Sequence, residues 1–271
     1  MKPRERDPDL VALLEKISEV RGFCGNSYKE GCLRRRIAVR MRARGVHTYE
    51  QYAQVLDGDA DEYDRLLDTI TINVTKFFRN RETWQRLEAE VLPDLWTTRE
   101  GRVRCWSAGC ASGEEPYTLA ILFLELVRAL PHAPRGGASI DATDLDRTSL
   151  AHAAEGVYRP AAFDEMPAAL VSRYVRGDDP RHLAPEVKEM VRFHQHDLLR
   201  SPPPHPPYDL VMCRNVVIYF DRPTQEQLFR RFVDALHHGG YLVLGKVETL
   251  VGEVRQELEL VDARERIYRR P

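Results

Sequence analysis

The sequence predicts an α/β protein in which a small all-helical domain precedes a mostly parallel sheet covered by helices. Three observations predict this fold. Apolar residues in the first part of the chain recur at helical spacing, whereas after residue 80 short strand-like segments alternate with amphipathic helices. The composition, 43% hydrophobic and 30% charged, is that of a globular protein with a sizeable core.

The first domain is predicted at residues 1–80. Apolar residues over 10–20 follow the 3.6-residue period, and Gly22 closes that helix. Leu33, Ile37 and Met41 form one stripe of a second helix. Thr48 and Gln51 predict a capping box at the start of a third, and residues 63–70 predict a fourth.

The second domain is predicted at residues 81–271. A linking helix is expected to end at Pro93. Strands are expected at 103–107, 139–143, 209–213 and 241–244, helices at 116–130 and 224–236, and a closing antiparallel hairpin at 257–261 and 265–269. Short segments at 174–176, 181–184 and 189–196 predict a small β insertion at about 174–193.

Several classes of protein are excluded by composition. No apolar run approaches the roughly 18–20 residues of a membrane helix, and the charged N-terminus is not a secretory signal. We therefore expect a cytoplasmic protein without membrane insertion. The five cysteines are odd in number and lack C-x-x-C spacing, so we expect free thiols that are mostly buried, with neither a disulfide framework nor a metal site.

The segment Val103–Tyr117 predicts a ligand loop between a strand and a helix. Gly109 and Gly113 allow close approach of the backbone to a ligand. Glu114 and Glu115 follow the loop and would repel a pyrophosphate but favour a positively charged ligand, such as the sulfonium and ammonium groups of S-adenosylmethionine. The alternative is that these acids serve only the helix dipole.

Polar residues also follow the next strands. Asp144 could accept both hydroxyls of a ribose or act only as a turn residue. Arg214 and Asn215 fall at a strand end where a substrate would enter, with Tyr219 one helical turn later; Asn215 could instead cap a helix.

Two further patterns suggest binding. In the interdomain segment 71–79, Thr71, Asn73 and Thr75 alternate and would project to one side, with Phe77-Phe78 as an anchor. Arg36, Arg40 and Arg44 are spaced to share one helix face and could dock an acidic helix, although a solvated face is the commoner outcome.

Together these segments resemble the chemotaxis receptor methyltransferase (CheR) family. The matching pieces are T-I-N-V-T-K-F-F-R at 71–79, W-S-A-G-C-A-S-G-E-E-P-Y at 106–117, A-T-D-L-D at 142–146 and C-R-N-V-V-I-Y-F-D at 213–221. The resemblance implies a seven-stranded, Rossmann-like methyltransferase sheet with a small antiparallel β insertion, preceded by an all-helical domain. It also implies S-adenosylmethionine as cofactor and methylation of receptor glutamates.

The resemblance assigns roles by position. Asn73, Thr75 and Arg79 would contact S-adenosylmethionine or border its methyl group. Glu115 would meet its amino-acid part or nearby backbone, and Arg214 and Asn215 would line the methionine side. Asp144 would hold the ribose, and Asp197 and Leu198 would flank the adenine. Arg79 and Tyr219 would orient the substrate carboxylate, and Arg36, Arg40 and Arg44 would face chemoreceptor cytoplasmic helices. We expect a monomer.

The chain departs from the family pattern at Lys246-Val247, where His-Ser is common, and its β insertion is short, which favours receptor binding without a tail tether. Two other functions stay open. One is a catalytically silent module that binds cofactor or receptor. The other is a nucleic-acid methyltransferase, against which the isoelectric point near 6.5 argues.

Overall fold

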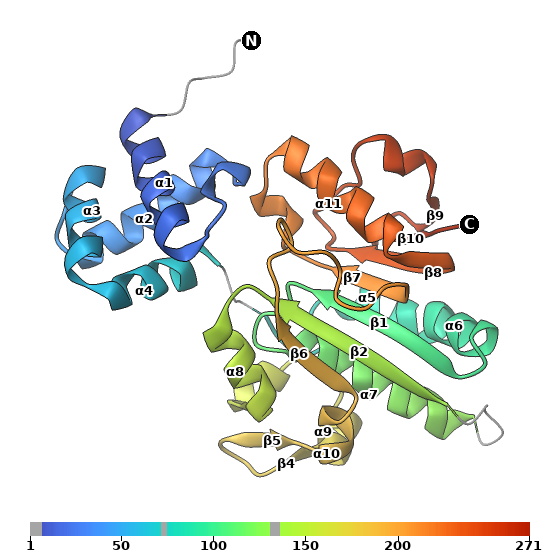
Figure 1. Cartoon of the computed structure of the whole chain (residues 1–271). Coiled ribbons are helices and arrows are strands. Elements are labelled where there is room, and N and C mark those ends of the chain that lie inside the picture. Colours follow the sequence, from blue (N-terminus) through green and yellow to red (C-terminus); the bar gives the residue numbers. More distant parts are fainter. Residues whose placement is uncertain (1–6, 72–74, 131–135) are drawn as a thin grey trace. The chain divides into compact units, whose positions relative to one another are not determined.

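The computed structural model describes residues 7–71, 75–130 and 136–271, and it forms two compact units (Figure 1). The first unit comprises residues 1–73 together with the distant segment Ile218–Thr224. The second comprises Val74–Val217 and Gln225–Pro271. The first unit is helical and the second contains both sheets.

The described part of the first unit holds helices α1 (Pro8–Arg21), α2 (Glu30–Ala43), α3 (Tyr49–Gly58) and α4 (Ala60–Ile70). The predicted helix ends are confirmed. Gly22 is left-handed, with φ 70°, and donates its N–H to Ser18. Thr48 and Gln51 form the reciprocal capping box.

Apolar stripes of these helices form the core of the first unit. Leu10, Leu14, Ile17, Leu33, Ile37, Tyr52, Leu56 and Leu66 are buried. The segment 218–224 joins the unit through backbone bonds. Lys29 donates its N–H to the Tyr219 carbonyl (2.9 Å), and Asp221 donates to that of Ser27 (2.9 Å). Ring contact between Tyr28 and Phe220, with centroids 4.8 Å apart, completes this attachment.

The second unit is built on a seven-stranded sheet in the order β6-β2-β1-β7-β8-β10-β9. The strands are β1 (Arg102–Ala108), β2 (Gly137–Asp144), β6 (Val191–Gln195), β7 (Tyr208–Cys213), β8 (Leu236–Leu244), β9 (Glu259–Asp262) and β10 (Ile267–Arg269). Strands β6, β2, β1, β7 and β8 pair in parallel, and β10 is antiparallel to both of its neighbours. The predicted parallel sheet with a closing hairpin is therefore confirmed.

Helices α5 (Arg81–Arg86), α6 (Leu92–Thr98), α7 (Glu114–Ala129), α8 (Arg147–Glu155), α9 (Ala168–Tyr174), α10 (Pro185–Lys188) and α11 (Arg222–Asp234) accompany the strands. The sequence predicted that the linking helix ends at Pro93, and this prediction was wrong. A π-helical turn at Leu87–Val91 precedes α6, and Pro93 falls in its first turn, where the missing N–H costs little.

The β insertion is a three-stranded antiparallel sheet of order β3-β5-β4, from β3 (Val157–Tyr158), β4 (Val175–Arg176) and β5 (Arg181–Leu183) (Figure 1). Placing 189–196 in this excursion was wrong. That segment is β6 of the main sheet, paired in parallel with β2 from Ile140↔Val191 to Asp144↔Gln195. The sequence of a short strand does not indicate which of two sheets the strand joins.

Candidate active site

The loop after β1 is shaped by its glycines. Gly109 has φ 84°, and a Cβ there would lie 2.5 Å from Cγ2 of Val216. Gly113 has φ 93°, and its Cβ would lie 2.9 Å from that of Ala153. Both positions exclude a side chain by backbone conformation and by space. The loop is anchored on β2, because the N–H of Gly109 donates to the carbonyl of Thr143 (2.8 Å).

The two acids that begin α7 point to different partners. Glu115 accepts hydrogen bonds from Oγ of Ser107 (2.9 Å) and Nη1 of Arg214 (3.3 Å). Burial raises the pKa of Glu115, and the Arg214 guanidinium opposes that rise. Glu114 instead accepts from Oγ of Ser112 (2.7 Å), and burial raises its pKa as well. Glu115 therefore has a partner beyond the helix dipole.

Arg214 connects the end of β7 to the segment that precedes α5. Its guanidinium lies over the Trp84 ring, 5.3 Å from the centroid. Nη2 donates to the carbonyl of Arg79 (2.9 Å) and to Oδ1 of Asn80 (3.2 Å). Burial lowers the pKa of Arg214, against the effect of Glu115. The structure thus brings together three predicted residues, Arg79, Glu115 and Arg214.

Asn215 presents a buried acceptor. Its Oδ1 has no hydrogen-bond partner among the described residues, and its backbone has φ 62°. Its N–H donates to Oε2 of Glu248 (2.9 Å), which also accepts the N–H of Gly245 (2.6 Å). Glu248 therefore fixes this turn, beside Lys246-Val247. Lys246 pairs with Glu82 at 2.9 Å.

Asp144, at the end of β2, accepts two backbone N–H groups. Ala111 donates to Oδ2 (2.8 Å) and Asp146 donates to Oδ1 (3.0 Å). Burial raises the pKa of Asp144, and these hydrogen bonds oppose the rise. Asp144 therefore acts as a turn residue, which was one of the two roles that the sequence allowed. Each carboxylate oxygen keeps a second lone pair for a ligand hydroxyl.

Asp197 and Leu198 follow β6 after one residue, His196, beside the end of β2. The N–H of His196 donates to the carbonyl of Asp144 (2.8 Å), which places these segments side by side. Oδ1 of Asp197 accepts the N–H of Leu199 (2.8 Å), and the carbonyl of Leu198 accepts from Nη1 of Arg231 (2.7 Å). The ends of β2, β6 and β7 and the loop and helix after β1 therefore carry the candidate cofactor residues Glu115, Asp144, Asp197, Leu198, Arg214 and Asn215.

The other predicted residues have different outcomes. Asn73 lies outside the described residues. Thr75 is half-buried, and the predicted aromatic anchor follows it: Phe77 is fully buried and stacks on Phe163 with centroids 4.6 Å apart. Tyr219 belongs to the first unit, so its part in the site stays a prediction.

The basic residues of α2 are largely engaged within the first unit. Arg40 makes two hydrogen bonds to the buried carboxylate of Glu62 (2.9 and 2.7 Å). Arg44 pairs with Asp59 (3.0 Å) and follows the helix as its C-cap residue, not as part of its face. Nε of Arg36 is buried without a hydrogen-bond partner in the described ranges.

Backbone strain marks the site, and the sequence did not reveal it. Four non-glycine residues there have positive φ: Phe78 (58°), Asn80 (61°), Ala111 (46°) and Asn215 (62°). Such residues tend to cluster where a site is held in a fixed conformation. Asn80 and Asn215 could have indicated these positions, because asparagine adopts the left-handed conformation more readily than most residues.

Comparison with known proteins identifies the family of both parts of the chain. Residues 8–71 match the family model "CheR methyltransferase, all-alpha domain", and residues 73–267 match "CheR methyltransferase, SAM binding domain". The chain is 36% identical to a chemotaxis protein methyltransferase of Listeria innocua, over 83% of each chain. It is 33% identical to one of Salmonella typhimurium, over 92% of this chain and 86% of that protein.

A third relative contains a similar sequence within a longer protein. The chain is 34% identical, over 99% of its length, to an uncharacterized 104.1 kDa protein of Rhodobacter capsulatus, of which it covers 28%. Within the described ranges, no helix is long and apolar enough to cross a membrane. Both family domains are present in order, with the glycine loop and its acids at the strand ends; the chain belongs to the CheR family of S-adenosylmethionine-dependent chemotaxis methyltransferases.

Proposed function

We propose that this chain transfers a methyl group from S-adenosylmethionine to glutamate side chains on chemoreceptor cytoplasmic helices, which gives glutamyl methyl esters. One observation carries the proposal most directly. The Gly109–Gly113 loop, with Glu115 behind it and the unpartnered Oδ1 of Asn215 beside it, is an acceptor-rich cradle for a cationic ligand. The names of the relatives support a substrate in the chemotaxis pathway.

The residues present fit the cofactor. Oδ1 of Asn215 is a buried acceptor that an ammonium group would satisfy. Asp144 has lone pairs for the ribose hydroxyls, and Asp197 and Leu198 lie beside it for the adenine. Arg214 donates hydrogen bonds to Glu115 and to the Arg79 carbonyl and so holds both in place. Because Glu115 neutralises its positive charge, Arg214 would not repel a cationic cofactor. Asn73 and Thr75 would border the methyl group.

The chemistry requires alignment and not a strong base. When bound, S-adenosylmethionine supplies a methyl group that is attached to a positively charged sulfur. This sulfur is a good leaving group because it becomes a neutral thioether. The substrate carboxylate, with a reference pKa of about 4.3, is ionised at neutral pH. Its oxygen forms the new C–O bond while the C–S electron pair returns to sulfur. We assign Arg79 and Tyr219 to orienting that carboxylate, because the transfer needs the carboxylate aligned with the methyl group and stripped of water.

Receptor docking falls to the basic side of α2. Glu62 and Asp59 already form ion pairs with Arg40 and Arg44. These two arginines are therefore held in place, but their positive charge is partly neutralised and attracts an acidic receptor helix less. Arg36 is therefore the residue we expect to contribute most to an acidic receptor helix. Arg36→Ala should raise KM for a receptor fragment several-fold, with little change in kcat. Arg35→Ala, the exposed neighbour on another side of α2, is the matched control.

The deciding experiment is transfer of labelled methyl to a purified receptor cytoplasmic fragment, followed by mild base. We expect label that is released as methanol, the sign of a glutamyl ester. The label should be lost with Arg79→Ala and strongly reduced with Tyr219→Phe, but retained with Arg81→Ala, an exposed arginine two residues away. Cofactor binding without transfer would instead support the catalytically silent module, and base-stable label on nucleic acid the other alternative.

A further inference from the structure

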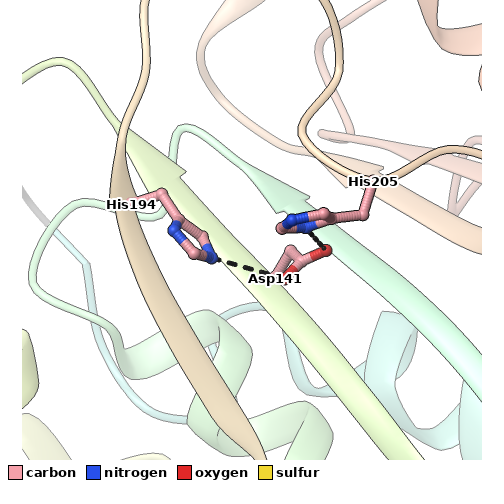
Figure 2. A group of neighbouring side chains, drawn as sticks. All are labelled: Asp141, His194 and His205. Carbon is pink, nitrogen blue, oxygen red and sulfur yellow. Dashed lines mark hydrogen bonds and ion pairs between the residues drawn. The ribbon is translucent and has the colours of Figure 1, made fainter.

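Three potential metal ligands converge on one face of the main sheet, apart from the residues of the candidate active site. Asp141 lies on β2, His194 on the neighbouring β6, and His205 in the proline-rich loop that leads to β7 (Figure 2). One ligand atom from each residue lies within 4.8 Å of the other two. The three residues come from segments up to 64 positions apart, so no local spacing motif announces them.

Hydrogen bonding explains only part of this arrangement. Nδ1 of His205 lies 3.0 Å from Oδ2 of Asp141, and the hydroxyl of Tyr208 donates to that same oxygen at 2.9 Å. Nε2 of His194 faces the other oxygen, Oδ1, at 3.5 Å. That nitrogen is buried and has no hydrogen bond within the part of the chain that the structure describes. A buried imidazole nitrogen without a partner calls for a ligand.

The spacing suits a tetrahedral metal ion. With metal–ligand bonds of about 2.1 Å, two ligands of a tetrahedral ion lie about 3.4 Å apart. Nδ1 of His205 lies 3.0 Å from Oδ2 of Asp141, and Nε2 of His194 lies 3.5 Å from Oδ1, so both nitrogens are already near this distance from the carboxylate, and a small rotation of the carboxylate would let a single oxygen serve as the shared ligand. The two imidazoles, with centroids 5.6 Å apart, would have to approach each other slightly. The loop can supply this movement, since the His205 side chain is 53% exposed.

We propose that Asp141, His194 and His205 bind one late first-row divalent cation of the zinc class. Two imidazole nitrogens and one carboxylate oxygen suit such ions, whereas magnesium and calcium prefer oxygen ligands alone. The Tyr208 hydroxyl would orient the carboxylate as an outer partner. Because the His205 side chain is half-exposed, a water molecule could occupy the fourth coordination position of the ion. The cysteine pattern gave no sign of this site, because none of its ligands is a cysteine.

The ion would fasten the proline-rich loop to β2 and β6. Asp141 lies three residues before Asp144, and His194 three residues before Asp197, so the same two strands lead to the candidate cofactor residues. A bound cation would therefore stabilise the end of the sheet that carries them. Binding to the folded chain alone raises thermal stability in proportion to the logarithm of free metal concentration.

The test uses the full chain without an affinity tag, stripped with chelator and titrated with Co²⁺, an optically visible substitute for zinc. We expect one equivalent to bind with the intense visible absorption of a four-coordinate site, and Zn²⁺ to displace it. His205→Ala should weaken binding at least tenfold and abolish that absorption, and this variant should fold because the side chain is half-exposed. His47→Ala, an exposed histidine of the first unit, is the control.

His194→Ala provides a second variant and should have the same effect, with the fold monitored by circular dichroism. The proposal is overturned if the wild-type chain shows no saturable Co²⁺ binding. It is equally overturned if binding survives unchanged in both His194→Ala and His205→Ala, since the ion would then sit elsewhere. Either result would leave a hydrogen-bonded His–Asp pair without a metal function.

Discussion

Replacing Glu115 with alanine should strongly destabilise the second unit, because it strands a buried charge. The Arg214 side chain is 2% exposed and forms an ion pair with the Glu115 carboxylate. At the 3.3 Å that separates Nη1 from Oε2, the attraction is about 5 kcal/mol at an effective dielectric constant of about 20. Breaking a buried pair by removing one partner costs about 3–5 kcal/mol, so we expect a loss in that range.

The assay is urea unfolding of the full chain followed by tryptophan fluorescence. All three tryptophans, Trp84, Trp96 and Trp106, lie in the second unit, so the signal reports that unit. Glu257→Ala is the matched control. It breaks an exposed pair with Arg230, whose Nη1 lies 2.8 Å from the carboxylate, and should cost far less stability than Glu115→Ala because solvent screens the pair.

A second variant separates charge from packing. Replacing Glu115 and Arg214 together with methionine removes both charges and should restore much of the lost stability, because no unpaired charge remains. If Glu115→Ala costs no more than Glu257→Ala, Arg214 must reach water or another anion, and the reasoning about a closed pair is refuted.

Three further predictions concern other parts of the chain. Gly245→Ala should destabilise the second unit by about 1–3 kcal/mol in the same urea assay, because its Cβ would lie 2.8 Å from the backbone nitrogen of Asn215 and 2.8 Å from Oε2 of Glu248; an unchanged midpoint would contradict this. Phe77→Ala should cost about 3–5 kcal/mol, since the ring is fully buried; a smaller loss would mean that the linker anchor is dispensable. Burial raises the pKa of Glu62, but hydrogen bonds led by Arg40 outweigh it and the net pKa is lowered. Its stabilisation of the first unit is therefore complete above the ordinary carboxyl pKa of about 4.3 and is lost as pH falls through the lower folded value, so by circular dichroism Glu62→Gln should destabilise at pH 7 but much less at low pH.

Local rules predicted the local structure well. Gly22 and the Thr48–Gln51 capping box ended and began helices where expected, because capping involves residues within a few positions of one another. The exception was Pro93, which the sequence read as a helix end. A proline is equally at home in a first turn, and only the π-helical turn before it decided between the two.

The site was predictable as a set of motifs and not as a set of contacts. Strand ends at Asp144 and Arg214 were foreseen, because parallel strands bring their carboxyl ends to one edge of a sheet. That Glu115 and not Glu114 meets Arg214 was not foreseen. Neighbouring residues on a helix point about 100° apart, and which of them faces β7 depends on how α7 packs.

By itself, the sequence determined the helical first domain, the parallel sheet, the ligand loop and, through its motifs, the family to which the chain belongs. Each of these depends on periodicity or on residues close together in the chain. Tertiary structure alone decided that β6 joins β2, that residues 218–224 pack with the helical unit, that Glu62 neutralises Arg40, and that Asp141 meets His194 and His205. The physical reason is common to all four: these partners are separated by 22 to nearly 200 residues, and only the order of strands and the packing of helices brings such distant side chains together.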